Sequence, residues 1–270
     1  MKNKKYWIVF SLVILIIFSV CVIKTNDSIS LETVYTNTEG LSNKKIGWGI
    51  KRSENHEQPD LGSVNKSLLE QYNGIAMGSS EKKLVYLTFD EGYEAGYTEK
   101  ILEQLKENDV KACFFLTAHY VNKEEGLVKR MIEEGHTIGN HTVNHKSMPD
   151  LTDEQIKSEI MNLHTAVYEK TGYEMKYIRP PKGEYSERTL ALTNNLGYTT
   201  VMWSLAYDDW NEDNQKGEAY AKEKILNNIH PGCVILLHGN SKDNANVLGD
   251  VIKEIKNMGY EFKTLDEFIK

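Results

Sequence analysis

Apolar and polar positions divide the chain into short apolar runs and longer amphipathic stretches, which alternate from Leu84 to the end. A short apolar run is typical of a buried strand, whereas Gly96–Asn108 places Ile101, Leu102 and Leu105 on one helical face. The predicted strands are Leu84–Phe89, Ala112–Thr117, Thr137–Asn140, Tyr177–Ile178, Thr199–Met202, Cys233–Leu237 and one near Phe262. The predicted helices are Gly96–Asn108, Glu124–Glu134, one from a cap at Thr152 or Asp153 to Thr171, Glu187–Asn195, Glu218–Ile229 and Val247–Met258. About seven such alternations predict an α/β fold whose mostly parallel sheet is closed, or nearly closed, into a barrel.

The N-terminus carries a membrane-targeting pattern. Three lysines precede an uncharged run from Tyr6 to Ile23, which approaches the roughly 20 residues that span a bilayer. Residues 1–25 are therefore predicted to be a signal anchor or a signal peptide, and the lack of a small-residue cleavage pattern favours the anchor. The basic start predicts that the N-terminus stays inside and that the rest of the chain lies outside the membrane.

Composition divides the remainder of the chain into three parts. Residues 26–46 are rich in Asn, Ser, Thr and Lys, which is typical of a linker. Residues 47–81 contain Trp48, Pro59, Tyr72 and several glycines, and we expect them to form an extension packed on the main domain. The main domain is predicted to occupy residues 82–270.

Size and charge limit the class of protein. A chain of 270 residues with 40% hydrophobic content can bury the core of one large α/β domain, and we expect a monomeric catalytic domain. The net charge of -7 and the pI near 5.7 argue against a nucleic-acid binder, which needs a basic patch to neutralise phosphates. Cys113 and Cys233 lie in apolar runs, so we expect them to pack in the core without forming a disulfide.

Side chains capable of catalysis follow several of the predicted strands. The carboxyl ends of parallel strands meet at one edge of a sheet, where loops present side chains from a rigid frame. We therefore expect these side chains to gather at one site. They are Asp90, Glu91, His141, Arg179, Asp209 and His238.

Carboxylates and histidines in this set predict a metal site. Asp90 and Glu91 are adjacent after an apolar strand, where unpaired charge costs desolvation, so they indicate a bound cation or an acid–base role. A solvated turn is the alternative. His141 and His145 are four residues apart, a spacing that points both imidazoles the same way. Two histidines and one acid leave positions open for water and substrate, which suits Zn²⁺, with Co²⁺, Mn²⁺ or Fe²⁺ as alternatives.

The remaining polar residues suit supporting roles. Arg179 precedes a proline-rich turn and is suited to pair with a buried carboxylate, the alternative being a surface arginine. His238 follows an apolar strand and is a candidate general acid that Asp209 orients. A strand-end histidine bonded to backbone is the alternative for His238.

Five stretches of sequence carry a family resemblance. They are Thr88-Phe89-Asp90-Glu91-Gly92, His141-Thr142-Val143-Asn144-His145, Arg179-Pro180-Pro181-Lys182-Gly183, Asp209-Trp210 and Leu236-Leu237-His238. In this order they resemble the motifs of the carbohydrate esterase family 4 polysaccharide deacetylases, also called the NodB homology domain. The resemblance extends from Leu84 to the C-terminus and implies a distorted (β/α)7 barrel.

The resemblance also implies a role for each matched residue. Asp90 would be the general base and Arg179 the residue that orients it. His238, supported by Asp209, would be the general acid. Acetate and a free amine would be the products.

The metal ligands follow from the same resemblance. It implies that His141 and His145 bind a divalent metal ion. Glu91 occupies the position where the family has an aspartate as the third ligand and where one branch often has asparagine. Glutamate has one more methylene than aspartate, and its carboxylate can still bind the metal or can instead hydrogen-bond to the residues that do. The predicted metal site therefore depends on Glu91.

Further stretches resemble one branch of the family, the enzymes that deacetylate N-acetylmuramic acid on the way to muramic δ-lactam in spore cortex. They are 88–94, 203–210 and 238–245. We expect a peptidoglycan deacetylase that acts outside the membrane, anchored or secreted, at the spore cortex or forespore envelope. The alternatives are a deacetylase of N-acetylglucosamine or of an exopolysaccharide, and a non-catalytic glycan-binding protein.

Overall fold

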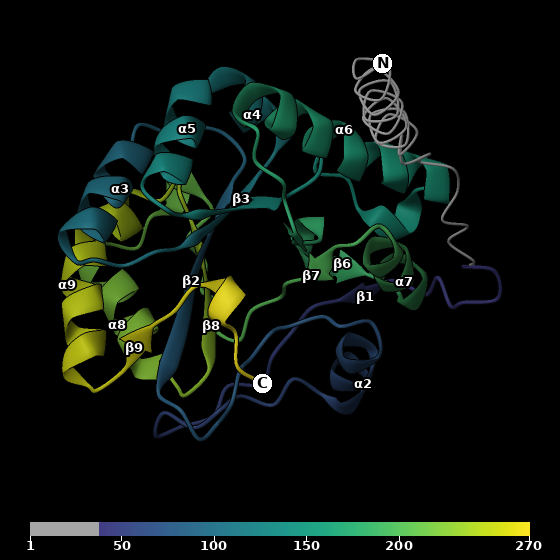
Figure 1. The fold of residues 1–270 in the computed structure, drawn as a ribbon. Helices are drawn as coiled ribbons and strands as arrows, with labels where there is room; N and C mark the ends of the chain where they lie inside the picture. Colours follow the sequence, from purple (N-terminus) through teal and green to yellow (C-terminus); the bar gives the residue numbers. More distant parts are fainter. Residues whose placement is uncertain (1–37) are drawn as a thin grey trace, which may run out of the picture. The chain divides into compact units, whose positions relative to one another are not determined.

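A computed structural model describes residues 38–270 (Figure 1). Residues 1–37, which hold the predicted anchor and part of the predicted linker, lie outside the described residues. In the described part of the chain, no helix is long and apolar enough to cross a membrane. A seven-stranded parallel sheet has the order β7-β5-β4-β3-β2-β8, with β9 also on β2, and β1 pairs with β6 in a small antiparallel sheet. The strands are β1 Ile46–Gly47, β2 Leu84–Glu91, β3 Cys113–Leu116, β4 Thr137–Asn140, β5 Tyr177–Ile178, β6 Glu184–Tyr185, β7 Thr199–Thr200, β8 Cys233–His238 and β9 Glu261–Phe262.

Strand β2 is buried along its whole length and pairs in parallel with β3 and β8, so that Asp90 lies opposite His238. Successive side chains of a strand point to opposite faces of the sheet. Phe89 packs in the larger hydrophobic cluster, together with the core faces of the helices, whereas Tyr86 packs in the cluster on the other face. By this alternation Asp90 continues the Tyr86 face and Glu91 continues the Phe89 face.

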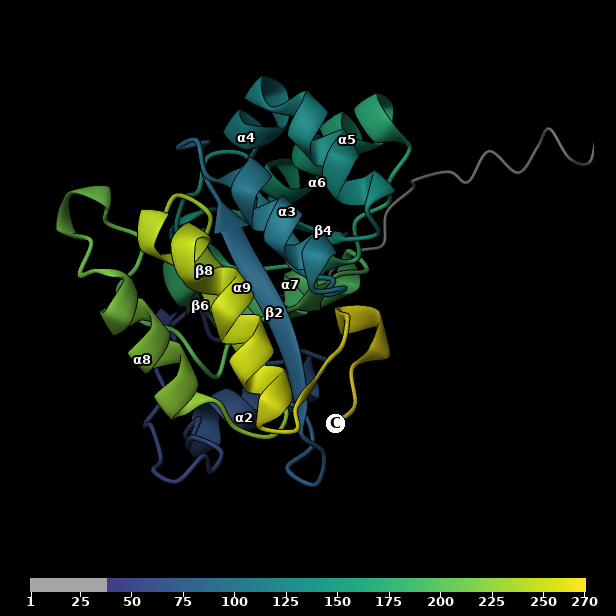
Figure 2. The same ribbon diagram turned by 90° about the vertical axis from the view of Figure 1, so that its left-hand side faces the viewer.

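Helices cover the sheet, and α3 and α9 lie side by side over β2 (Figure 2). The predicted apolar face of Ile101, Leu102 and Leu105 in α3 is fully buried. The helices are α2 Ser63–Gln71, α3 Thr98–Glu107, α4 Ala118–Lys123, α5 Glu125–Glu133, α6 Asp153–Thr171, α7 Glu187–Asn195, α8 Glu218–Asn228 and α9 Lys242–Asn257. Short 3-10 turns occupy Met148–Asp150, Pro181–Gly183, Glu212–Asn214 and Leu265–Glu267.

Two helices differ from the apolar pattern: α4 was not predicted, and α9 begins earlier than predicted. Thr117, predicted to end a strand, caps the short helix α4 with its side chain. Helix α9 begins after Ser241, whose side chain accepts a hydrogen bond from the Asn244 N–H, whereas the pattern predicts a start at Val247. The first turn of α9 is polar, so hydrophobic periodicity does not reveal it.

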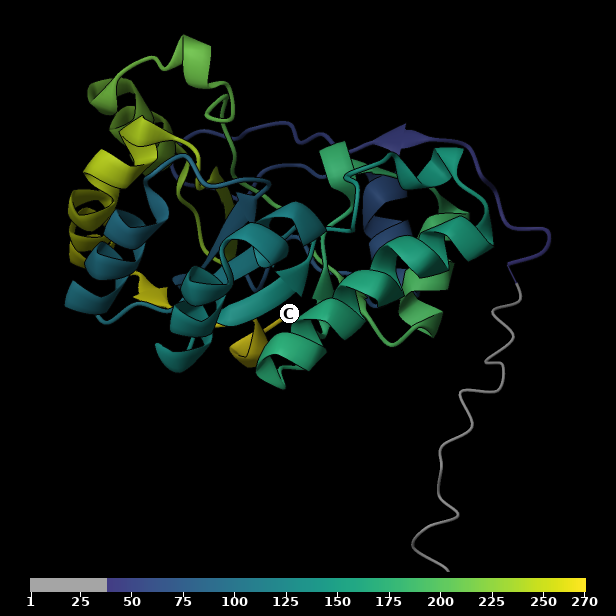
Figure 3. The ribbon, with the colours of Figure 1, turned by 90° about the horizontal axis from the view of Figure 1, so that it is seen from above.

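The segment before β2 packs against the C-terminal half of the sheet. Its helix α2, dark blue in Figure 3, lies beside the green α7. The Trp48 indole N–H donates to the Trp203 carbonyl at 2.9 Å, and the Arg52 guanidinium donates to the Ala206 carbonyl at 2.7 Å. These bonds hold the segment beside the loop that follows β7.

The two end strands of the sheet, β7 and β8, do not pair with each other in the described part of the chain. β7 ends at Thr200, although the pattern predicts a strand to Met202, because Ile75 takes up the Thr200 carbonyl and the Met202 N–H. The residues that follow β7 contact β8 through an isolated parallel bridge between Leu205 and Ile235. The predicted parallel α/β sheet is therefore confirmed, but it is a curled sheet that closes less completely than the predicted barrel.

Candidate active site

A cavity of ≈ 1230 Å³ opens at the carboxyl ends of β2, β4 and β8. It brings together Asp90 and His238, which are 148 residues apart in the sequence, as the parallel sheet predicts. Arg179 and Asp209 are buried beside it, each in contact with one of the lining residues. The predicted site residues that line the cavity are Asp90, His141, His145 and His238.

Asp90 is held by a fully buried arginine. Arg179 donates from Nη1 to Asp90 Oδ1 at 2.7 Å and from Nη2 to Thr88 Oγ1 at 2.8 Å, and its guanidinium lies 4.2 Å from the centre of the Phe115 ring. Burial alone would raise the pKa of Asp90, but Arg179 outweighs it and the pKa is lowered. Asp90 is therefore a carboxylate at neutral pH, and its Oδ2 faces His141.

His141 and His145 form the opposite wall and are neutral. The His141 Nδ1–H donates to the Arg179 carbonyl at 2.9 Å, so Nε2 carries the lone pair, and the two imidazole centres are 4.8 Å apart. Burial lowers the pKa of His141, and it lowers that of His145 to about 4. His145 and Thr142 both have left-handed backbone, with φ of 53° and 67°, a strained conformation for these residues that is common at functional sites.

The donor chemistry of this wall fits a divalent cation. His141 Nε2 and Asp90 Oδ2 lie 3.4 Å apart, and both are acceptors, so a positive charge beside them removes their repulsion. A histidine whose other nitrogen donates to a backbone carbonyl is typical of a metal ligand. Among residues 38–270, however, no three His, Cys, Asp or Glu side chains form a group that could hold a metal ion. The assignment of His141, His145 and Glu91 as one set of metal ligands therefore stays a prediction.

Glu91 lies on the other face of β2, as the strand alternation requires. It is 1% exposed, and neither carboxylate oxygen has a hydrogen-bond partner among the described residues. A β-carbon placed on Gly239 would lie 1.9 Å from Glu91 Oε1, so the carboxylate occupies the space that a side chain at 239 would need. Burial, followed by the charges of Glu94 and Asp90, raises the pKa of Glu91 well above its ordinary value. Glu91 thus points to the opposite face of β2 from Asp90, whose Oδ2 faces His141.

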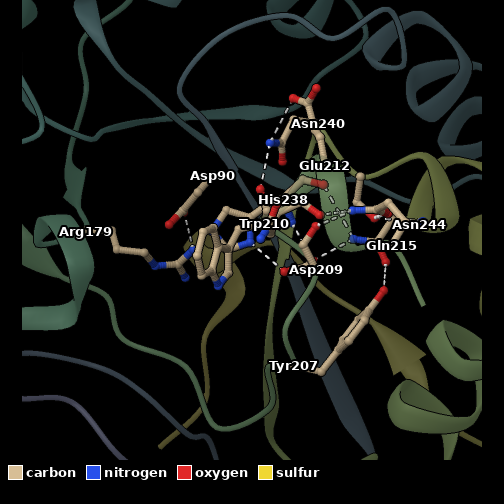
Figure 4. A network of polar contacts seen from close by, with 12 residues as sticks. Asp90, Arg179, Tyr207, Asp209, Trp210, Glu212, Gln215, His238, Asn240 and Asn244 are labelled. Carbon is tan, nitrogen blue, oxygen red and sulfur yellow. Dashed lines mark hydrogen bonds and ion pairs between the residues drawn. The ribbon is translucent and has the colours of Figure 1, made fainter. Parts of the chain in front are cut away.

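His238 is bound by Asp209 on the far side of the cavity (Figure 4). Its Nδ1–H donates to Asp209 Oδ1 at 2.7 Å, and its backbone N–H donates to Oδ2 at 2.9 Å. Burial would lower the pKa of His238, but Asp209 outweighs it and the pKa is raised. A protonated imidazole with its Nδ1–H committed to a carboxylate can donate a proton from Nε2.

A buried polar chain lies behind Asp209 and was not predicted. Asn244 donates to Asp209 Oδ2 at 2.6 Å, and the Tyr207 hydroxyl donates to the Asn244 side-chain carbonyl. Both residues fall in stretches that resemble the muramic-acid branch, which was the available signal. Asp208, the neighbour of Asp209, is exposed and pairs with Lys216.

Comparisons with known proteins agree with this geometry. The polysaccharide deacetylase family matches residues 77–201. The peptidoglycan-N-acetylmuramic acid deacetylase PdaA of Bacillus subtilis is 45% identical over 86% of this chain and 88% of its own length, and a Bacillus cereus peptidoglycan-N-acetylglucosamine deacetylase is 35% identical over 74% and 73%. The structure of Bacillus subtilis PdaA, a family 4 carbohydrate esterase, superposes with a TM-score of 0.83 over 84% of this chain and 98% of that chain. The chain therefore belongs to the polysaccharide deacetylases of carbohydrate esterase family 4.

Proposed function

We propose that this enzyme removes the N-acetyl group of N-acetylmuramic acid in peptidoglycan. The observation that carries the proposal is the opposed pair in the cavity: Asp90, which accepts a hydrogen bond from Arg179 at 2.7 Å, and His238, which donates one to Asp209 at 2.7 Å. Hydrolysis of an acetamide needs a base and an acid on either side of the same carbonyl carbon. These two residues supply both, because Arg179 lowers the pKa of Asp90 and Asp209 raises the pKa of His238.

The reaction uses Asp90 as the general base and His238 as the general acid. Asp90 accepts a proton from a water molecule as the water oxygen bonds to the acetamide carbon. The C–N bond then breaks, and His238 Nε2 gives its proton to the departing nitrogen, so that acetate and a free amine leave. A divalent cation held by His141 and His145, with Zn²⁺ as the first candidate and Co²⁺ or Mn²⁺ as alternatives, supplies polarisation of the acetamide carbonyl when bound.

The choice of muramic acid rests on charge in the cavity. Muramic acid carries a lactyl carboxylate, which glucosamine lacks. Arg52 and Lys182 line the cavity, and cationic side chains favour an anionic group of the substrate. The relative named for N-acetylmuramic acid is 45% identical to this chain, and the relative named for N-acetylglucosamine is 35% identical. The higher identity also favours muramic acid as the substrate.

The place of action follows from the substrate and the N-terminal sequence. Peptidoglycan lies outside the cytoplasmic membrane, so we propose that residues 1–25 are an anchor or signal peptide that carries residues 82–270 there. The spore cortex or forespore envelope is the site at which muramic δ-lactam forms. The enzyme would meet the glycan strands there as a monomer.

Mass spectrometry of defined glycan strands tests the substrate. The full chain is loaded with Zn²⁺ and incubated with alternating glucosamine–muramic acid oligomers, with and without stem peptides. We expect one acetyl group to be lost from each muramic acid and none from glucosamine. Loss from glucosamine alone would favour the N-acetylglucosamine alternative. Strands that bind but stay intact, with metal loaded, would favour the non-catalytic alternative.

A further inference from the structure

His141 and His145 differ in what places their backbone. His141 follows β4 directly, and its backbone N–H donates to the Leu116 carbonyl at 2.9 Å, so the sheet places it. His145 lies four residues further on, in a loop where both it and Thr142 have left-handed backbone. Such a strained backbone persists only where surrounding contacts hold it. The contacts of this loop therefore decide where the His145 imidazole lies.

A buried glutamate of α6 binds the loop. Glu159 is 7% exposed, and both of its carboxylate oxygens accept hydrogen bonds from Asn144. Oε2 accepts from the Asn144 backbone N–H and Oε1 from the Asn144 side-chain amide, each at 2.7 Å. The Glu159 backbone carbonyl also accepts from the Val143 N–H at 3.1 Å. One residue of α6 thus bonds to both residues that directly precede His145.

The carboxylate of Glu159 depends on these bonds in turn. Burying a carboxylate is costly unless a cation or strong hydrogen bonds compensate. In the described part of the chain, no Lys, Arg or His side chain forms an ion pair with Glu159. The two bonds from Asn144 therefore compensate for its burial, and bonds to a charged acceptor are stronger than neutral ones.

Packing leaves space beside this contact. A second cavity, of ≈ 230 Å³, is lined by Glu159 and by Lys146, the residue after His145. Side chains do not fill this space, so the dispersion contacts that hold a well-packed loop are missing there. The hydrogen bonds to Glu159 are therefore needed to keep the loop in its strained conformation.

The start of the loop is anchored separately. Asn140, the last residue of β4, donates to the Ile160 carbonyl and accepts from the Thr142 N–H, each at 2.9 Å. Neither bond uses the Glu159 side chain. Loss of that side chain should therefore displace His145 and leave His141 in place.

We propose that Glu159 is a positioning residue of the active site, which holds the loop so that the His145 imidazole stays beside that of His141. The two ring centres lie 4.8 Å apart in this arrangement. The inference rests on the proposed function for the role of the cation that the two histidines bind. Its direct consequence is that cation affinity depends on a residue that does not touch the cation.

Glu159→Ala and Glu159→Gln separate the hydrogen bonds from the rest of the side chain. We expect Glu159→Ala to weaken Zn²⁺ binding at least about tenfold by calorimetry, as for other residues that hold a metal ligand in place. Glu159→Gln should stay within about threefold of wild type. Its carbonyl can accept from the Asn144 N–H, and its amide can donate to the Asn144 side chain once that amide turns over. Glu169→Ala is the matched control, because Glu169 is an exposed glutamate of the same helix.

A double variant distinguishes positioning of His145 from general destabilisation. If Glu159 acts through His145, adding Glu159→Ala to His145→Ala should weaken Zn²⁺ binding by less than about a further twofold. A full additional loss of tenfold would overturn the inference. Denaturant unfolding of the metal-free variants confirms that each is folded. Should Glu159→Ala not fold, Asn144→Ala removes the side-chain bond alone, and we expect it to weaken Zn²⁺ binding about threefold.

Hydrogen exchange of the metal-free protein tests the loop without activity or cation. The Asn144 backbone N–H should exchange at least about tenfold faster in Glu159→Ala than in wild type, whereas the amides of β4 should not change. Equal exchange at Asn144 in the two proteins would overturn the inference. If no acetate is released from any glycan strand, the proposed function fails, while faster exchange and weaker Zn²⁺ binding in Glu159→Ala still support the positioning role.

Discussion

Histidines on the two walls of the cavity have pKa values that are shifted in opposite directions. The difference does not follow their exposure, because His141 is buried, His238 is half-buried and His145 is exposed. His141 and His145 meet a backbone carbonyl and each other, and burial keeps the pKa of both low. His238 meets both oxygens of Asp209, which overcomes the same burial and raises its pKa. The hydrogen-bond partner of the imidazole, more than its burial, therefore decides whether a histidine can bind a metal or donate a proton.

Replacing His141 tests the neutral wall and should have the largest effect. His141→Ala removes the lone pair that faces Asp90 Oδ2. We expect kcat/KM on glycan strands to fall by about 10³-fold or more, because cation binding beside Asp90 depends on this ring. Acetate release and bound metal by elemental analysis measure the two effects. His164→Ala is the control, since His164 bonds to the Tyr198 hydroxyl and does not line the cavity. Full activity in His141→Ala would refute the role of this wall.

Replacing Asp209 should lower the pKa of His238 toward the low values of His141 and His145. His238 acts as an acid only while protonated, so activity declines as pH rises through its pKa. Asp209 is what raises that pKa against burial, so Asp209→Asn should move the alkaline limb of the kcat profile to lower pH. We expect kcat at neutral pH to fall about 10²-fold. An alkaline limb that stays in place would show that another group donates the proton.

Removing the Tyr207 hydroxyl probes the same wall from a greater distance. The hydroxyl fixes the Asn244 amide, whose N–H₂ group donates to Asp209 Oδ2. Tyr207→Phe should lower kcat about fivefold and shift the alkaline limb in the same direction, as expected for a residue that acts through another. Combined with Asp209→Asn it should add little, because both act on one path. Additive losses would place Tyr207 outside this chain.

The sequence predicted which segments form the strands of the parallel sheet better than it predicted where those strands end. β2 and β8 were predictable because both are continuous apolar runs buried on both faces. The end of β7 was not, because Ile75, from a segment more than a hundred residues earlier, takes up its hydrogen bonds. A contact between such distant residues leaves no local pattern.

The site divides in a similar way. Asp90 and His238 were predictable because each is an ionisable residue that follows an apolar run, where burial without a partner would be costly. Asn244 was not, because an asparagine in the first turn of a helix is common on sequence grounds alone. Its importance comes from Asp209, which only the fold brings to it.

Glu91→Gln tests whether Glu91 ever joins the neutral wall, and we expect its effect on metal binding to be the smallest. Its carboxylate packs against Gly239 on the helix face of β2, so the variant should bind Zn²⁺ within about threefold of wild type by calorimetry. His145→Ala, measured in parallel, should lose at least about tenfold. A tenfold loss in Glu91→Gln would mean that the carboxylate turns toward the histidines when metal binds.

The same variant should change how stability depends on pH. Because the pKa of Glu91 is raised in the folded state, the folded protein holds this proton more tightly than the unfolded chain does. Its contribution to stability is present below the unfolded pKa and is lost as pH rises through the folded pKa. Glutamine does not ionise, so the unfolding free energy of Glu91→Gln should fall less across that window than that of wild type. Denaturant unfolding at several pH values measures this difference, and parallel curves would mean that Glu91 has a partner in solution.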